Sequence, residues 1–153
     1  MERDVVLVTF NYRLQVFGFL SLDDRSLNIP GNAGLKDQVM ALRWVKENIE
    51  NFGGDSNNIT IFGQSSAGGC AHFHLLSPST KDLFQRSIIM SGSAFNPMYA
   101  AIPRRNWAFR LSVALGCTGP EIDSEILRFL EAADPEAIFI EVGRLVTDYV
   151  SEN

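Results

Sequence analysis

The fold of this chain is decided by one stretch of sequence, residues 59–69, which reads Ile59-Thr60-Ile61-Phe62-Gly63-Gln64-Ser65-Ser66-Ala67-Gly68-Gly69. The first four residues are β-branched or aromatic, as is typical of a buried strand. Glycine and other small residues follow at once and open a helical stretch, which extends to about residue 76 and ends before Pro78. We therefore predict a strand that turns sharply into a helix.

Segments of the same two kinds lie on either side of this unit. Apolar runs predict further strands at residues 5–10 and 88–90, and a stretch rich in turn residues predicts a loop at 11–32. Apolar spacing predicts helices at residues 34–52, 104–115, 123–132 and 135–150, the first of them ended by Gly53-Gly54. Strands that alternate with helices predict an α/β fold, with mostly parallel strands, right-handed crossovers and flanking helices.

Two adjacent serines compete for the role of a nucleophile in the turn. A nucleophilic serine must project its oxygen clear of the backbone, and a sharp strand-to-helix turn does this with small residues two positions before and after it, the pattern G-x-S-x-G. Ser65 gives G-x-S-x-A, with Ala67 in the last place, whereas Ser66 puts Gln64 where a small residue is needed. One added methyl group is the milder steric problem, so Ser65 is favoured and Ser66 stays open as the alternative.

The other parts of a catalytic site are not recognised in the chain. His72 and His74 follow Ser65 by seven and nine residues, about 10 Å or more along the helix. A general base must reach the nucleophile within hydrogen-bond distance, so we interpret both histidines as structural. No later histidine follows, although hydrolases with this turn use the chain order serine, acid, histidine. A glycine-rich loop that could give a second oxyanion donor is also missing, so we expect an incomplete site.

Composition argues against several other classes of function. The 153 residues are 46% hydrophobic and 20% charged, which fits a folded core, and the net charge of −5 with scattered basic residues argues against nucleic acid as a partner. The apolar run at 5–10 is too short for a secretory signal or a membrane span. Cys70 and Cys117 have neither disulfide-framework nor metal-ligand spacing, and Cys70 is interpreted as a buried packing residue. We expect no metal and no cofactor.

Longer motifs surround the serine turn from about residue 5 to residue 93. They are VTFNYR at 8–13, GNAGLKDQ at 31–38, ALRWV at 41–45, FGGD at 52–55, LLSP at 75–78 and MSGS at 90–93. Together with GQS at 63–65, these motifs resemble the type-B carboxylesterase and cholinesterase family.

This resemblance implies an α/β-hydrolase fold and the hydrolysis of a small-molecule carboxylic ester through an acyl-enzyme. Ser65 matches the family nucleophile, and the backbone N–H of Ser66 matches one oxyanion donor. Arg13 and Asp37 match a pair that forms a buried salt bridge in this family. Family members are several times longer, so residues 1–153 are expected to be part of a single carboxylesterase domain whose N- and C-terminal portions are absent.

The sequence departs from the family pattern at four positions. Gln64 replaces a frequent glutamate and Met98 a frequent tryptophan of the acyl pocket, so both are candidate substrate-binding residues, and a preference for cationic esters is disfavoured. Phe129 stands where some members have the disulfide partner of the cysteine at 117, so that bond is not expected. Ala67 belongs to a stretch that looks like the family's S-A-G-G displaced by one residue, which keeps Ser66 open.

Two other hypotheses remain beside the enzyme. One is a non-catalytic cholinesterase-like adhesion or binding protein, and the other is an inactive truncated product. The retained Ser65 favours the enzyme over the adhesion protein. For the 153 residues alone we predict no activity and poor solubility, because parallel strands would expose unpaired edges.

Overall fold

The structure, a computed structural model, describes residues 4–96 and 106–152. The chain divides into two compact units that interleave along the sequence. One is Met1–Tyr12 with Leu35–Pro103, and the other is Arg13–Gly34 with Arg104–Asn153. The motif around Ser65 lies in the first unit.

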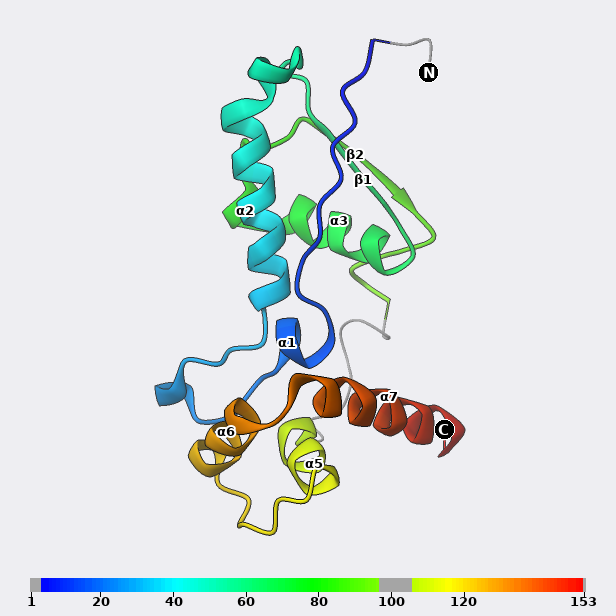
Figure 1. Ribbon diagram of the computed structural model, residues 1–153. Coiled ribbons are helices and arrows are strands. Elements are labelled where there is room, and N and C mark those ends of the chain that lie inside the picture. The colour runs from blue at the N-terminus through cyan, green and yellow to red at the C-terminus, as the bar shows by residue number, and fades with distance from the viewer. Residues whose placement is uncertain (1–3, 97–105, 153) are drawn as a thin grey trace. The chain divides into compact units, whose positions relative to one another are not determined.

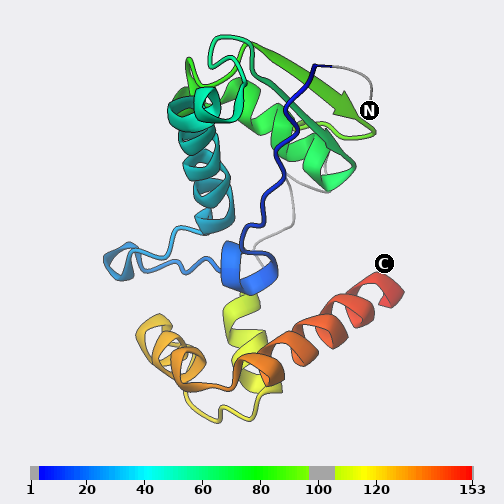
Figure 2. The same ribbon diagram turned by 45° about the horizontal axis from the view of Figure 1, so that its top comes forward.

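The first unit is built on a parallel strand–helix–strand arrangement. Strand β1 (Thr60–Gln64) leads into helix α3 (Ser66–Leu76), and a turn of 3-10 helix, η3 (Pro78–Thr80), precedes strand β2 (Arg86–Met90). The two strands are parallel, with Phe62 opposite Ile88 and Gln64 opposite Met90. In Figures 1 and 2, α3 lies along this sheet and contacts both strands. The predicted α/β arrangement is confirmed here.

The two faces of this sheet differ in burial because successive side chains of a strand point to opposite faces. One set is half-buried or buried and contains Ile61, Gly63, Ser87 and Ile89. The opposite set is exposed, and its largest apolar members are Phe62 at 55% and Ile88 at 53% exposed. Helix α3 therefore covers one face, and the other face of this two-stranded sheet presents apolar side chains.

Helix α2 (Ala33–Asn48) supplies the rest of the first unit's buried surface. Its side chains Gln38, Leu42 and Val45 are buried, as is Ile49 in the following 3-10 turn η2 (Ile49–Phe52). This spacing is that of one helix face. Gly53 ends the element with a φ of 79°, as the double glycine predicts.

The strand predicted at residues 5–10 is not formed in this structure. Residues 4–12 have no regular secondary structure, and Val5 is 69% exposed. A β-branched run favours extended backbone, but a strand also needs a neighbour that accepts and donates its ladder hydrogen bonds. The described sheet pairs β1 with β2 only, so the extended run has no ladder.

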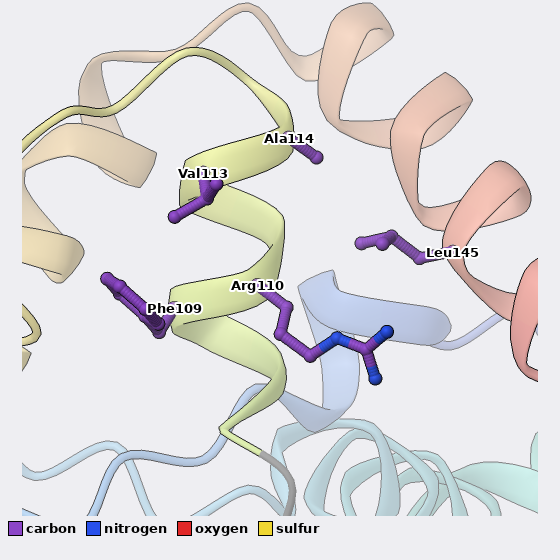
Figure 3. Close-up of a pocket in the computed structure, with 5 residues that line it drawn as sticks. All are labelled: Phe109, Arg110, Val113, Ala114 and Leu145. Carbon is purple, nitrogen blue, oxygen red and sulfur yellow. The ribbon is translucent and has the colours of Figure 1, made fainter.

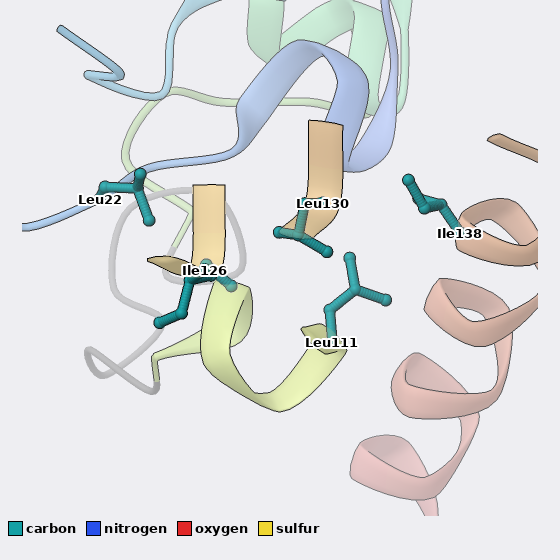
Figure 4. Packing of buried hydrophobic residues seen from close by; sticks show 6 residues of the cluster. Leu22, Leu111, Ile126, Leu130 and Ile138 are labelled. Carbon is teal, nitrogen blue, oxygen red and sulfur yellow. The ribbon is translucent and has the colours of Figure 1, made fainter. Parts of the chain in front are cut away.

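The second unit is helical. It contains α1 (Gln15–Phe19), a 3-10 turn η1 (Arg25–Leu27), α5 (Trp107–Ala114), α6 (Asp123–Ala132) and α7 (Pro135–Glu152). The last three confirm the predicted helices, with α5 beginning later than expected, after the Asn106 side chain accepts from the N–H of Phe109. Figure 4 shows the buried cluster that holds this unit together: Leu22, Ala108, Leu111, Ile126, Leu130 and Ile138.

The loop predicted at residues 11–32 contains two short helical segments that were not predicted, α1 and the 3-10 turn η1. Helix α1 spans Gln15–Phe19 and has no side-chain cap at Leu14. Gly18 within it is buried, and a Cβ at this position would overlap the carbonyl group of Arg13. Helix α1 was not predicted because it has neither a capping residue nor an apolar stripe, and a close backbone approach leaves no start signal in a sequence.

Candidate active site

Ser65 has the unusual backbone conformation that distinguishes it from its neighbour. It lies between the end of β1 and the start of α3, with φ 55° and ψ −120°. A residue with a side chain rarely adopts positive φ, and such a conformation costs about 1–3 kcal/mol unless the surroundings enforce it. Ser66 is the first residue of α3. The strained turn is thus centred on Ser65.

The turn is sharp because glycine allows the backbones on either side of it to touch. A Cβ at Gly63 would overlap the carbonyl group of Ala67. On the helix side, the crowded position is Gly68, where a Cβ would lie 2.8 Å from the carbonyl oxygen of Met90. The side chain of Ala67 itself is half-buried. This arrangement explains why alanine can stand in the last place of the motif.

Ser65, which carries the candidate nucleophilic hydroxyl group, is exposed to solvent. The Ser65 side chain makes no capping hydrogen bond to α3, although serine in that position commonly caps a helix. The backbone of Ser65 is held instead: its N–H donates to Met90 O at 2.8 Å, and its carbonyl accepts from Gly69 N–H at 3.0 Å. The hydroxyl group is therefore exposed on a fixed backbone, at the N-terminus of a helix that favours negative charge.

A turn after β2 completes the surroundings of Ser65, and the sequence prediction missed it. Gly92 lies so close that a Cβ there would overlap the Ser65 carbonyl oxygen and come within 2.6 Å of Gly69 N. The sequence did carry a signal, since Ser91-Gly92-Ser93 directly follows a strand. The carboxyl ends of adjacent parallel strands meet at one edge of a sheet, which is where ligands bind in such folds.

Both histidines make hydrogen bonds away from Ser65. His74 is buried, and its Nε2 lies 2.7 Å from Oε1 of Gln38 on α2. Burial lowers the pKa of the His74 imidazole below its ordinary value. His72 accepts at Nδ1 from the backbone N–H of Ala94, at 3.2 Å. Within the described residues, no hydrogen bond joins either histidine to Ser65, in line with the structural interpretation.

The other predicted residues have different outcomes. Gln64 is exposed at the end of β1, beside Ser65, whereas Met98 lies outside the described residues. The Arg13–Asp37 salt bridge stays a prediction. Cys70, expected to be buried, is half-buried and hydrogen-bonds Tyr12. Burial, with a smaller contribution from this thiol, raises the pKa of the Tyr12 phenol.

Two cavities of the second unit, formed by residues that the structure describes, do not provide a catalytic constellation. One, of about 290 Å³, lies between α5 and α7 and is lined by Phe109, Arg110, Val113, Ala114 and Leu145 (Figure 3). A second, of about 300 Å³, is lined mainly by apolar side chains of α1, α6 and α7, with Leu111 of α5. Neither lining contains a serine, cysteine or histidine, so Ser65 remains the candidate for chemistry.

The described part of the chain contains neither a metal-binding cluster nor a membrane-spanning helix. Residues 4–96 and 106–152 contain no group of three or more histidine, cysteine, aspartate or glutamate side chains that could hold a metal ion. Nor does any helix in those ranges have the length and apolar character needed to cross a membrane.

The chain that carries the serine turn and its sheet is similar to known proteins. A model of the carboxylesterase family matches residues 1–151. The chain belongs to the carboxylesterase family. Its β1–α3–β2 unit is accordingly part of an α/β-hydrolase fold, as the motifs predicted.

Among the curated relatives of this carboxylesterase chain are two insect proteins and a human one. Esterase B1 of Culex pipiens is 45% identical over 97% of the chain, and juvenile hormone esterase of Tribolium castaneum is 55% identical over 77%. Bile salt-activated lipase of Homo sapiens is 43% identical over 88%. The matches cover 27%, 20% and 18% of these relatives, so the chain spans about a quarter or less of their length.

Proposed function

We propose that the intact protein, meaning the full product that carries this chain, hydrolyses small-molecule carboxylic esters through an acyl-enzyme. Ser65 is the nucleophile in this proposal, and the backbone N–H of Ser66 is one oxyanion donor. A general base takes the Ser65 proton as the Ser65 oxygen attacks the carbonyl carbon of the substrate, and the carbonyl oxygen becomes an oxyanion. The ester C–O bond then breaks, and a general acid gives a proton to the leaving alcohol. Water then hydrolyses the acyl-enzyme.

The observation that carries the proposal is the backbone of Ser65. Its φ of 55° and ψ of −120°, on an exposed residue between β1 and α3, are what a nucleophile elbow requires. Ser66 is helical and lacks this conformation, which favours Ser65 over the alternative. The helix N-terminus behind Ser65 supports charge development on the substrate oxygen.

The base and its acid belong to other parts of the intact protein in this proposal. His72 and His74 hydrogen-bond Ala94 and Gln38, so neither is available to take the Ser65 proton in the described arrangement. The matched segments cover 27%, 20% and 18% of the three relatives, which leaves ample chain in proteins of that length for a histidine, an acid and a second oxyanion donor. The 153 residues alone are then inactive.

Labelling with a fluorophosphonate probe tests the nucleophile. In the intact protein, the probe modifies wild type and the Ser66→Ala variant, and peptide mass spectrometry finds the adduct on Ser65. Ser65→Ala loses the label. A Ser65→Ala variant that still labels would refute the assignment. Absence of labelling in a folded wild type would favour the non-catalytic adhesion or binding protein.

Gln64 is a proposed substrate-binding residue, and a substitution that adds a negative charge at this position tests its role. It is exposed beside Ser65 and neutral, whereas a glutamate there would attract a cationic substrate. Gln64→Glu should raise kcat/KM for a cationic ester over its neutral isostere by about fivefold, which matches the ~1 kcal/mol that two charges ~4 Å apart gain in water. An unchanged ratio would remove Gln64 from the substrate surface. Met98, outside the described residues, stays a proposed acyl-pocket residue.

A further inference from the structure

The segment that follows β2 is held at two points by the elements around Ser65. At its start, Met90 O accepts the N–H of Ser65 at 2.8 Å. Further along, the N–H of Ala94 donates to His72 Nδ1 at 3.2 Å. Ala94 is itself buried and the bond is partly buried, so removal of the imidazole would leave this N–H without its protein partner.

His72 makes a second contact with the same segment. Its ring meets Phe95 edge to face, with centroids 5.4 Å apart and planes at 88°. His72 is half-buried on α3, two turns after Ser65. Since Nδ1 accepts the Ala94 N–H, the neutral ring carries its proton on Nε2. The side chain of His72 thus contacts Ala94 through a hydrogen bond and Phe95 through its ring.

Between these two points the segment touches the candidate nucleophile. The Gly92 backbone packs against the Ser65 carbonyl and Gly69 N. Ser91 has a φ of 52°, next to the 55° of Ser65. Each of these two serines follows one of the two paired strands. Positive φ is unfavourable for serine and persists only where surrounding contacts fix the backbone.

We infer that His72 is a positioning residue for the Ser65 nucleophile. Its Nδ1 holds Ala94, which keeps Gly92 against the Ser65 backbone and the Ser65 hydroxyl in its reactive direction. His72 acts through the 91–94 turn and touches no reacting atom. The inference rests on the proposed function of Ser65.

Two substitutions of His72 distinguish the effect of its hydrogen-bond acceptor from the effect of its aromatic ring. His72→Phe keeps an aromatic ring against Phe95 but removes the acceptor, whereas His72→Asn removes the ring and offers an oxygen close to the place of Nδ1. In the intact protein, both are compared with wild type for the rate of Ser65 labelling by fluorophosphonate, at a temperature where all three are folded by circular dichroism. Hydrogen exchange of the Ala94 amide is followed in parallel.

The expected result is a split between the two variants. His72→Phe slows labelling roughly tenfold and speeds Ala94 exchange by a similar factor, because a buried N–H without a partner is costly. His72→Asn recovers the labelling rate to within about threefold of wild type. A purely structural side chain would not give this rescue, since the asparagine fills less space than the phenylalanine.

Three outcomes would overturn the inference. Wild-type labelling in His72→Phe would show that the acceptor is dispensable, and equal slowing in both variants would show that a restored acceptor does not restore the position of Ser65. If the folded wild type does not label at Ser65, the proposed function fails and the positioning role fails with it. That last outcome differs from the first two, in which wild type labels normally.

Discussion

Gln38 and His74 pair in the interior of the first unit, joining α2 to α3. The distance from His74 Nε2 to Gln38 Oε1 is 2.7 Å, and both side chains are buried. An amide oxygen only accepts, so the imidazole donates and is protonated on Nε2. The His74 carbonyl also accepts from the Thr80 hydroxyl group. This pair links the helix after the serine turn to the rest of its unit.

The first prediction is a loss of stability on removing one partner. Gln38→Leu leaves the His74 N–H buried without an acceptor and should lower the free energy of unfolding by about 1–3 kcal/mol. Adding His74→Leu should cost less in that background than alone, because the two residues are coupled. Urea denaturation of the intact protein gives the free energy of unfolding of wild type, of each single variant and of the double variant. Met40→Leu, at an exposed position of α2, is the control. Simple additivity of the two losses would contradict the pairing.

The second prediction concerns the pH dependence of stability. Burial lowers the pKa of His74 below 6.5 in the folded state, so the unfolded chain binds the proton more readily. Stability from this group is therefore complete above about pH 6.5 and falls as the pH drops below that value towards the lower folded pKa. His74→Gln removes the titration. The fall in urea midpoint between about pH 7.5 and pH 5.5 should be smaller in this variant than in wild type. Equal slopes would contradict it.

The serine turn was predictable because its signals are local. The strand of residues 59–62, the small residues after it and the stop at Pro78 describe one continuous segment, and α3 begins and ends where these signals place it. The positive φ at Ser65 follows from the same pattern, because a strand that enters a helix without a loop must reverse direction at one residue.

The contacts that fix the serine turn were not predictable, because they join residues that are distant in the sequence. The bond from Ala94 to His72 joins positions 22 apart, and no local pattern specifies which histidine nitrogen accepts. The prediction of a strand at 5–10 was wrong for a related reason. A β-branched run favours extended backbone, but strand pairing depends on a neighbouring strand elsewhere in the chain. The amphipathic helix Asp123–Ala132 carries its own signal and matched residue for residue.

The third prediction tests the close contact beside Ser65. Gly92→Ala adds a methyl group that would overlap the Ser65 carbonyl, and should destabilise the intact protein by about 1–3 kcal/mol while slowing fluorophosphonate labelling. Gly143→Ala is the matched control, since nothing lies within 4 Å of a Cβ at that position of α7. It should stabilise by up to ~1 kcal/mol through helix propensity. Thermal unfolding measures both. Similar effects of the two alanines would rule out the contact.

The fourth prediction concerns the cluster that holds the second unit. Ile126 is 1% exposed among Leu111, Leu130 and Ile138, whereas Ile140 on α7 is 45% exposed. Ile126→Ala should cost about 2–5 kcal/mol, because it removes buried methyl groups and leaves a cavity. Ile140→Ala should change stability by no more than ~0.5 kcal/mol. Urea denaturation followed by circular dichroism at the helical band compares them. Equal losses would mean that this cluster is not the core of the unit.

The fifth prediction addresses the exposed face of the β1–β2 sheet. Phe62 and Ile88 lie opposite each other and are both more than half exposed, so they form a continuous apolar surface across the two strands. When the 153-residue chain is expressed by itself, this surface should promote self-association and bind a hydrophobic dye. Ile88→Thr keeps a β-branched residue while adding a hydroxyl group, and should reduce both light scattering and dye fluorescence. Ile89→Thr is the control, because Ile89 is half-buried on the face that α3 covers and its substitution should lower stability instead. Scattering that is unchanged by Ile88→Thr but reduced by Ile89→Thr would assign the self-association to another surface.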